Sequence, residues 1–332
     1  MVDEEKEQQR EAEMEKLPVV LQLRPVPAIA SVEDRILKKF RFLKAWESSM
    51  PMDLFLTTYA QSVRALLCFS RTPTADALRY LPSLQCIVTT SAGLNNIDLA
   101  ECRRRGIAVA NAGDTYSEDV ADYTIGLFLD VLRRISASDR YVRQSLWPTK
   151  GEYPLGSRLR GKRVGIVGLG HIGSEVAKRL VAFGCSISYN SRKKKSSVAF
   201  PYYSDVCDLA ANSDVLILSC GLTKETHHII NRDVLLALGE EGVIINVGRG
   251  AVIDEKELIK CLMQGEIGGA GLDVFENEPD VPKELRVLDN VVLSPHKAVF
   301  TSESDTSLHD LVIANLEAFF SNKPLLSEVK DE

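Results

Sequence analysis

The sequence predicts an α/β protein built from two doubly wound parallel sheets. Short apolar and β-branched runs alternate with helical patterns along the chain, which is typical of strand–helix–strand units in a parallel sheet. The alternation occurs once before residue 117 and begins again at residue 163. With 332 residues, the chain also exceeds what one hydrophobic core usually organises. Two domains are therefore expected.

The two sets of elements can be placed from these runs. In the first set we expect strands at 19–23, 65–69, 86–89 and 107–110, with helices near 32–40, 74–81 and 99–105. In the second set we expect strands at 164–167, 186–189, 215–219, 243–247, 270–274 and 291–293. An amphipathic pattern at 308–319 predicts a last helix.

The segment 117–143, between the two sets, carries apolar residues at helical spacing and predicts one long helix. Glu118 and Asp119 lie near its start, where a helix favours negative charge. Its apolar positions form two adjacent rows: Val120, Leu127, Val131 and Ile135 in one, Phe128 and Leu132 in the other. So wide an apolar face indicates that the helix either bridges the domains or packs against another subunit.

Composition excludes several classes of protein. The net charge of -6 argues against a general nucleic-acid binder, which needs clustered Lys and Arg. No apolar run approaches the roughly 20 residues of a membrane span. The seven cysteines are odd in number and form no CxxC pair, so we expect neither a disulfide framework nor a metal site. A reducing compartment fits this cysteine usage.

The two ends of the chain carry no targeting signal that we recognise. Residues 1–16 are dense in charge and resemble neither a secretory signal nor a transit peptide, so we interpret them as a solvated tail. The last residues, 329–332, do not form an SKL-like peroxisomal address. We therefore expect a cytoplasmic protein.

A glycine-rich turn carries the first functional signal. It follows the strand sequence VGIVG and leads into a helical pattern, and consists of Gly168, Leu169, Gly170, His171, Ile172 and Gly173. The first glycine allows the tight turn, the second admits a pyrophosphate, and the third permits close packing of helix and strand. Free N–H groups and the helix dipole then favour phosphate. The turn predicts a dinucleotide cofactor, and a plain connecting turn is the alternative.

The residues after the next strand indicate which dinucleotide is bound. An NAD enzyme places an acidic residue about 20 residues beyond the glycine turn, against the ribose 2′-hydroxyl. This chain instead has Ser191, Arg192 and Lys193, followed by two further lysines. A hydroxyl and a guanidinium can bind a 2′-phosphate through charge-assisted hydrogen bonds. We predict NADPH, bound by Ser191, Arg192 and Lys193, with Lys194 and Lys195 solvated; a wholly solvated basic loop is the alternative.

Further motifs carry a family resemblance. The sequences SAGLNNID, GRGAVIDEKEL, GGAGLDVFENEP and LSPH occur in this order, with the glycine turn after the first of them. Together they resemble the D-isomer-specific 2-hydroxyacid dehydrogenase family over residues 19–329. Within it the chain most resembles the plant-type NADPH-dependent glyoxylate and hydroxypyruvate reductases. The resemblance implies reduction of glyoxylate to glycolate and of hydroxypyruvate to D-glycerate.

The resemblance also implies a catalytic triad of Arg249, Glu278 and His296. Arg249 would clamp the substrate carboxylate with its planar fork of donors and polarise the adjacent carbonyl. His296 would donate a proton to the carbonyl oxygen while hydride reaches the carbon. Glu278 would hydrogen-bond the imidazole, stabilise its protonated form and fix its orientation.

Other contacts are implied by the same resemblance. The backbone N–H groups of Ala92 and Gly93 would bind the substrate carboxylate, and Asp273 would contact the nicotinamide amide. The path of the cofactor would be lined by Cys220, Gly221, Thr226, Val247 and Gly248.

Some nearby residues are given no binding role. We interpret the Cys220 sulfur as packing, and His227 and His228 as exposed turn residues, because adjacent positions rarely point at one ligand. His309 is expected to be structural. Lys297 departs from the family pattern beside the proposed proton donor, and it either attracts a second anionic group of the substrate or points outward.

The resemblance implies a discontinuous domain arrangement. A flavodoxin-like substrate domain would comprise 1–117 and 300–332, with a Rossmann NADP-binding domain, 118–299, inserted into it. It further implies a homodimer built around 117–143, and a cleft that closes on the substrate. Two alternatives stay open: a reductase of aromatic 2-oxo acids such as hydroxyphenylpyruvate, and a dinucleotide-sensing, corepressor-like binding protein.

Overall fold

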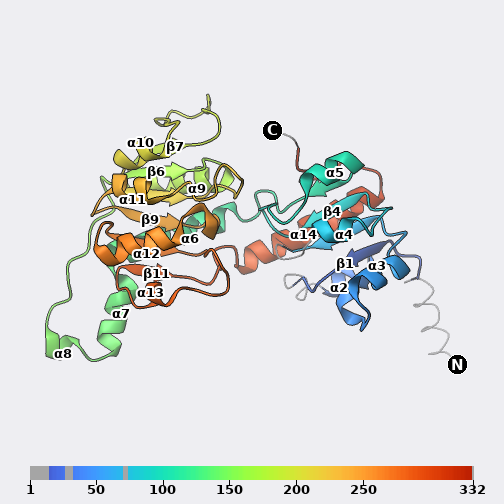
Figure 1. Ribbon diagram of the computed structural model, residues 1–332, viewed down its shortest axis with the longest axis horizontal. Coiled ribbons are helices and arrows are strands. Elements are labelled where there is room, and N and C mark those ends of the chain that lie inside the picture. Colours follow the sequence, from blue (N-terminus) through green and yellow to red (C-terminus); the bar gives the residue numbers. More distant parts are fainter. Residues whose placement is uncertain (1–14, 27–32, 70–73, 331–332) are drawn as a thin grey trace. The chain divides into compact units, whose positions relative to one another are not determined.

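Figure 1 shows a computed structural model of the chain, which describes residues 15–26, 33–69 and 74–330. The chain forms two compact units. Unit 1 comprises Met1–Thr115 with Thr301–Glu332, and unit 2 comprises Tyr116–Phe300. Each unit contains one sheet whose strands are all parallel, which confirms the predicted fold class. Of the charged segment 1–16, all but the last two residues lie outside the described ranges.

The sheet of unit 1 has the strand order β2-β1-β3-β4-β5, which is the flavodoxin-like order. Its strands are β1 (Val19–Gln22), β2 (Arg41–Lys44), β3 (Ala65–Cys68), β4 (Cys86–Thr89) and β5 (Ala108–Ala110). Its helices are α2 (Glu33–Ile36), η2 (Ala45–Glu47), α3 (Met52–Tyr59), α4 (Thr74–Leu78), α5 (Leu99–Arg105) and α14 (Ser302–Phe320). Residue 32, where we expected the first helix to begin, lies outside the described residues.

The end of the chain completes unit 1. The buried side chain of Asn315 in α14 accepts hydrogen bonds from the N–H groups of Leu326 and Ser327. Beyond them, Val329 donates a backbone hydrogen bond of 2.8 Å to Val109 in β5. The last residues therefore lie along β5, at the edge of the sheet.

Apart from the short η2, two elements of unit 1 were not predicted. β2 reads RFLK and is exposed or only partly buried along its length, as suits an edge strand with one neighbour. α3 follows it and buries only Phe55 and Leu56. Neither element contains the continuous apolar run by which the buried strands were located, which explains the omission.

The sheet of unit 2 has the order β11-β10-β9-β8-β6-β7. Its strands are β6 (Arg163–Val167), β7 (Ser186–Asn190), β8 (Val215–Leu218), β9 (Val243–Asn246), β10 (Gly269–Leu272) and β11 (Val291–Leu293). Next to β7, on the side away from β6, Tyr202 forms a single parallel bridge with Tyr189 of that strand. Counted as the third strand, it gives the order 3-2-1-4-5-6 of dinucleotide-binding domains, followed by one more strand.

Helices cover both faces of this sheet (Figure 1). One face packs on α6 (Ser117–Arg133) and α9 (His171–Ala182) through residues such as Val164 and Ile166 of β6. The other face packs on α10 (Val206–Ala211), α11 (Arg232–Leu238) and α12 (Glu255–Gln264). Leu216 and Leu218 belong to this second core, while Val215 and Ile217 belong to the first. Side chains alternate between the faces, as a strand requires.

The prediction of one helix over 117–143 is wrong. α6 ends at Arg133, Arg134 adopts a left-handed φ of 55°, and α7 (Ile135–Arg143) starts in a new direction. The Asp130 carboxylate accepts hydrogen bonds from the N–H and the hydroxyl of Ser136, which caps the new helix. In Figure 1, α7 and α8 (Trp147–Lys150) run away from the sheet of unit 2 before the chain returns to β6.

No helix in the described part of the chain is both long enough and apolar enough to cross a membrane.

Candidate active site

The predicted residues of unit 2 follow its strands at one edge of the sheet. Because the strands are parallel, their carboxyl ends meet at that edge, where α/β proteins bind ligands. The chain leaves β6 toward β7 on one side and returns to β8 on the other. The end of β6 is therefore the point where strand order reverses, and the glycine turn lies there.

Two glycines make the turn compact. Gly168 has a left-handed φ of +98°, and a Cβ placed on it would lie 2.6 Å from the backbone nitrogen of Cys220. A Cβ on Gly173 would lie 2.3 Å from the Gly168 carbonyl oxygen. Ser219 donates its hydroxyl to that same carbonyl at 2.8 Å. The turn is thus held against the end of β8, and a side chain at either glycine would force it away.

Gly170 differs from these two glycines. A Cβ placed on it would meet no atom within 4 Å, so the space beside it is open. It is also the N-cap of α9, and no side chain caps the helix there. His171 and Ile172 form the first turn of α9, and Leu169 is buried behind it. The helix thus presents uncapped N–H groups beside open space, which suits a phosphate.

The basic turn after β7 lies next to the glycine turn, since Gly168 donates a backbone hydrogen bond to Asn190. Arg192 and Lys193 are exposed, and Ser191 is partly buried and donates its hydroxyl to the Lys193 carbonyl at 2.7 Å. The pKa of Glu225 is lowered, first by the Thr223 hydroxyl and to a lesser extent by the charge of Arg192. The charge of Arg192 therefore reaches the turn that follows β8.

That turn contains three of the predicted cofactor contacts. Thr226 donates its hydroxyl to the Gly221 carbonyl at 2.7 Å and accepts from the N–H of Thr223. Burial raises the pKa of the Cys220 thiol to about 11. The thiol is therefore protonated near neutral pH and unsuited to act as a nucleophile, in agreement with its interpretation as a packing residue.

Arg249 lies just after β9, and Asn246 holds the loop that carries it. The Asn246 side chain accepts from the Gly248 N–H and donates to the Arg249 carbonyl, both at 3.0 Å. Val247 donates its N–H to Leu218 at the end of β8. Burial lowers the pKa of the Arg249 guanidinium, and the negative charge of Glu278 opposes this effect. The guanidinium therefore lies within electrostatic reach of Glu278.

Glu278 and His296 are directly hydrogen-bonded. His296 Nδ1 lies 2.8 Å from Glu278 Oε2, and the other carboxylate oxygen accepts from the N–H of Phe275 at 3.1 Å. The His296 side chain is 36% exposed and that of Glu278 19%. Because Nδ1 is engaged with Glu278, the opposite ring nitrogen, Nε2, is the one left to meet a substrate. All three predicted triad residues thus belong to one edge of one sheet.

Asp273 fixes the loop that carries His296. Its Oδ1 accepts from the Ser294 hydroxyl at 2.5 Å and from the Lys297 N–H at 2.7 Å, and its Oδ2 accepts from the Ala298 N–H at 3.0 Å. The Ser294 hydroxyl is also 2.6 Å from that of Tyr123 in α6. His296 itself has a left-handed φ of 54°. This network holds His296 in a conformation that few histidines adopt.

Ala92 and Gly93 belong to unit 1, where they follow β4. The Asn111 side chain donates to the Ala92 carbonyl at 2.9 Å and so fixes the loop. Within the described residues, neither N–H of this pair has a hydrogen-bond partner. Both remain available as donors.

Three other residues discussed from the sequence have clear positions. Lys297 is exposed, and its backbone N–H donates the hydrogen bond to Asp273. His309 is buried in α14, and its Nε2 has no hydrogen-bond partner among the residues that the structure describes. His228 is not a fully exposed turn residue, because it is half-buried and hydrogen-bonded to Glu276.

Sequence reasoning missed the residues that support the site: Asn246, Ser294 and Tyr123. Asn246 directly precedes the Gly248-Arg249-Gly250 loop, and an amide at a strand end that both donates and accepts could have been recognised as a loop clamp. No comparable signal marked Tyr123, because its partner lies far away in the sequence.

Comparison with known proteins agrees with this architecture. Residues 125–298 match the family model described as D-isomer specific 2-hydroxyacid dehydrogenase, NAD binding domain. A glyoxylate/hydroxypyruvate reductase of Arabidopsis thaliana is 56% identical over 321 residues, which are 96% of this chain and 99% of that protein. A hydroxyphenylpyruvate reductase of Plectranthus scutellarioides is 47% identical over 91% of this chain and 96% of its own.

A solved structure is similar over nearly the whole length. The NADPH-dependent glyoxylate/hydroxypyruvate reductase from Sinorhizobium meliloti, in complex with NADP and malonate, has a TM-score of 0.87 and 36% identity. The match covers 94% of this chain and 96% of that one. These findings confirm the resemblance inferred from the motifs, and the chain belongs to the D-isomer specific 2-hydroxyacid dehydrogenase family.

Proposed function

We propose that the protein uses NADPH to reduce a small 2-oxo acid, taking glyoxylate to glycolate and hydroxypyruvate to D-glycerate. The observation that carries the proposal is the His296–Glu278 hydrogen bond of 2.8 Å, with Arg249 in electrostatic reach, at the edge that holds the glycine turn. Relatives with 56% and 47% identity are named as reductases of 2-oxo acids, which supports the reaction class.

The residues present fit a phosphorylated dinucleotide. The uncapped start of α9 and the open space at Gly170 suit the pyrophosphate. Ser191, Arg192 and Lys193 offer a hydroxyl and two positive charges at the end of β7, where a 2′-phosphate belongs. Gly221, Thr226, Val247 and Gly248 complete the edge. When bound, NADPH supplies the hydride.

The chain's own residues would carry out the other parts of the reaction. Arg249 binds the substrate carboxylate and polarises the neighbouring carbonyl. As hydride reaches the carbonyl carbon, the C=O π electrons move to oxygen, and His296 donates the proton that completes the hydroxyl group. Glu278 holds Nδ1 of the ring, orients Nε2 toward the oxygen and stabilises the positive charge that the ring carries before it gives up its proton.

The remaining assignments complete the proposal. The N–H groups of Ala92 and Gly93 bind the substrate carboxylate from the substrate domain, 1–117 with 300–332. Residues 118–299 form the NADP-binding domain, in which Asp273 contacts the nicotinamide amide. Oδ1 of Asp273 already accepts two hydrogen bonds from the His296 loop and Oδ2 accepts one, so such a contact uses the remaining lone pair of Oδ2.

We further propose a cytoplasmic homodimer. On the extension that contains α7 and α8, Ile135, Val142, Trp147 and Leu155 are exposed, Leu155 to 94%. A concentration of exposed apolar side chains is typical of a surface that another subunit covers. All seven cysteines are free, as a reducing compartment would keep them.

A second candidate is an aromatic 2-oxo acid as substrate. The relative from Plectranthus scutellarioides, at 47% identity, is named as a hydroxyphenylpyruvate reductase, and its similarity covers 91% of this chain. The chemistry at Arg249, Glu278 and His296 is the same for both substrates. The two candidates differ only in the side group that the pocket accepts.

A substrate panel tests both proposals. Steady-state rates are measured with glyoxylate, hydroxypyruvate and 4-hydroxyphenylpyruvate, each with NADPH and with NADH. We expect the highest kcat/KM with NADPH and one of the two small acids. Equal use of NADH would contradict the 2′-phosphate assignment, and a higher kcat/KM with the aromatic acid would favour the second candidate. Binding to the dinucleotide without turnover of any acid would instead favour a sensing, corepressor-like protein.

A further inference from the structure

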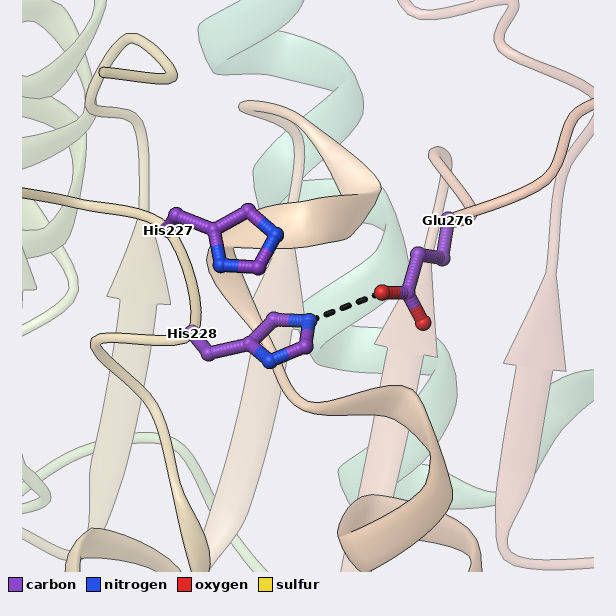
Figure 2. A group of neighbouring side chains, drawn as sticks. All are labelled: His227, His228 and Glu276. Carbon is purple, nitrogen blue, oxygen red and sulfur yellow. Dashed lines mark hydrogen bonds and ion pairs between the residues drawn. The ribbon is translucent and has the colours of Figure 1, made fainter. Parts of the chain in front are cut away.

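Three potential ligand groups converge at side chains to which the proposed reaction gives no role. Figure 2 shows His227, His228 and Glu276, whose ligand atoms all lie within 4.8 Å of one another. His228 Nε2 is 2.7 Å from Glu276 Oε1. The two imidazole rings stack, with centroids 3.9 Å apart and an angle of 28° between their planes. Two imidazoles and a carboxylate thus face one small region.

The backbone explains how adjacent histidines can face the same point. His228 has a left-handed φ of 52°, which turns its side chain to the side occupied by His227. Hydrogen bonds hold this turn, from the His227 N–H to the Thr223 carbonyl and from the His228 N–H to the Ala251 carbonyl. The expectation that adjacent positions point apart assumes ordinary backbone angles, and it does not apply here.

Acidic residues support both sides of the group. The Glu276 N–H donates to Glu255 Oε2 at 3.2 Å, which fixes the backbone that presents its carboxylate. Behind the other ligand, Asp254 Oδ2 lies 3.9 Å from His228 Nδ1. This distance is too long for a hydrogen bond, but the carboxylate lies on the side of the second ring nitrogen, where histidine ligands of metals almost always have a carboxylate or a carbonyl. Glu276 and Asp254 also give the region a negative charge that favours a cation.

We propose that His227, His228 and Glu276 bind a divalent transition-metal ion, with Zn²⁺ as the representative ion. Two imidazoles and one carboxylate form a three-ligand set that Zn²⁺ accepts, with water in the fourth position. Bonds of roughly 2.0–2.2 Å at tetrahedral angles separate ligand atoms by about 3.4 Å. The observed separations of 2.7 Å for the bonded pair and at most 4.8 Å for the set bracket this value.

Small side-chain rotations bring the ligands into place. His227 is exposed, and its ring can move without displacing a core residue. The ion replaces the proton shared by His228 and Glu276, so no charged group is left unpaired. The bound ion joins the turn after β8 to the segment after β10, two parts of the chain that the unfolded state does not hold together. Binding therefore stabilises the folded protein.

Metal binding to the full chain tests the proposal without reference to turnover. The protein is freed of metal with a chelator and titrated with ZnCl₂ by calorimetry, and thermal unfolding is recorded with and without the ion. We expect one tight equivalent and a higher Tm. Co²⁺ in place of Zn²⁺ should give the visible bands of a four-coordinate site.

The variants separate this site from other ligands. His227→Ala, which removes an exposed side chain, and Glu276→Gln should each weaken Zn²⁺ binding at least about 10-fold and abolish the Tm shift. Asp254→Asn keeps the helix cap of α12 and should weaken binding about 10-fold. Glu241→Gln, an exposed carboxylate elsewhere, and Cys207→Ser, a partly exposed thiol, should bind like the parent protein.

Two results with the variants would overturn the proposal. One is binding with unchanged affinity in both His227→Ala and Glu276→Gln, and the other is loss of the tight equivalent in Cys207→Ser. A parent protein that takes up no Zn²⁺ at concentrations up to its own would overturn it equally. Because the readouts are heat and Tm, failure here leaves the proposed reductase reaction untouched.

Discussion

The loop of His296 and the basic turn after β7 lie at the same edge of one sheet, but they are built differently. Around His296, both oxygens of Asp273 and both of Glu278 accept hydrogen bonds, and Asp273 is buried. In the basic turn, by contrast, Arg192 and Lys193 are exposed, and the Ser191 hydroxyl donates to the Lys193 carbonyl of the same turn.

The difference shows that proton transfer and phosphate recognition place different demands on the geometry of the side chains. Proton transfer needs the donor within hydrogen-bond reach of one atom, so the surrounding groups fix the ring. Recognition of a phosphate depends on positive charge and donors nearby, which flexible exposed side chains can supply. Changes in the first region should therefore remove activity, while changes in the second should alter cofactor preference and leave the chemistry intact.

The largest effect is expected for His296→Ala. Loss of the proton donor should lower kcat about 10³-fold, with NADPH affinity unchanged, because general acids contribute by about this factor. Stopped-flow or steady-state oxidation of NADPH with glyoxylate measures the rate, and NADPH fluorescence measures the affinity. Retention of full turnover would show that His296 is not the proton donor, and the two regions would then not differ in the way proposed.

Arg249→Lys should come second. Lysine keeps the charge but loses the planar fork, so KM for the 2-oxo acid should rise and kcat should fall, with kcat/KM reduced about 100-fold. The matched control is Arg163→Lys, which changes an exposed arginine paired with Asp214 outside the site. A loss of the same size in the control would show that the effect is not specific to the carboxylate clamp.

The double variant Ser191→Ala/Arg192→Ala tests the basic turn. KM for NADPH should rise roughly 10- to 100-fold, which corresponds to the binding free energy that charge-assisted hydrogen bonds contribute. KM for NADH should change less than about threefold. Lys194→Ala, in the same turn, should leave both constants unchanged. If the two cofactors were affected equally, the turn would not read the 2′-phosphate.

The smallest effect is expected for Tyr123→Phe, which removes the hydroxyl beside Ser294. We expect a loss of about 1 kcal/mol in unfolding free energy and a decrease in kcat of less than about fivefold. Tyr141→Phe is the control, since it removes a similar hydrogen bond, to Gly151, on the α7 extension. Denaturant unfolding and kcat are compared. A kcat equal to that of the control would show that Tyr123 does not act through the His296 loop.

The parts of the fold that repeat a strong local pattern could be predicted. The bounds of β4, β11 and α5 agree with the expected ranges, because each is a buried run or a helix between clear turn residues. The break at Arg134 could not be predicted, because Asp130 and Ser136 that cap it also fit a continuous helix. The β2 strand lacks an apolar run, so nothing in its own residues distinguished it from a loop.

The candidate site shows the same division. Arg249, Glu278 and His296 lie in motifs that identified them from the sequence, and the structure adds the hydrogen bond between two of them. The pairing of Tyr123 with Ser294 and of His228 with Glu276 joins residues that lie far apart in the sequence. Such pairs are products of the fold, and no local pattern encodes them.

The return of the chain into unit 1 has a consequence for the order in which the molecule can be assembled. Unit 2 is one continuous stretch, so it has all its strands as soon as residue 300 has been synthesised. Unit 1 is then still without α14, whose Leu308, Val312 and Leu316 are buried in the finished protein. The residues before 116 are therefore synthesised ahead of unit 2 but belong to the unit that is completed later, and the part of β4 that contacts α14 stays uncovered until this last helix arrives.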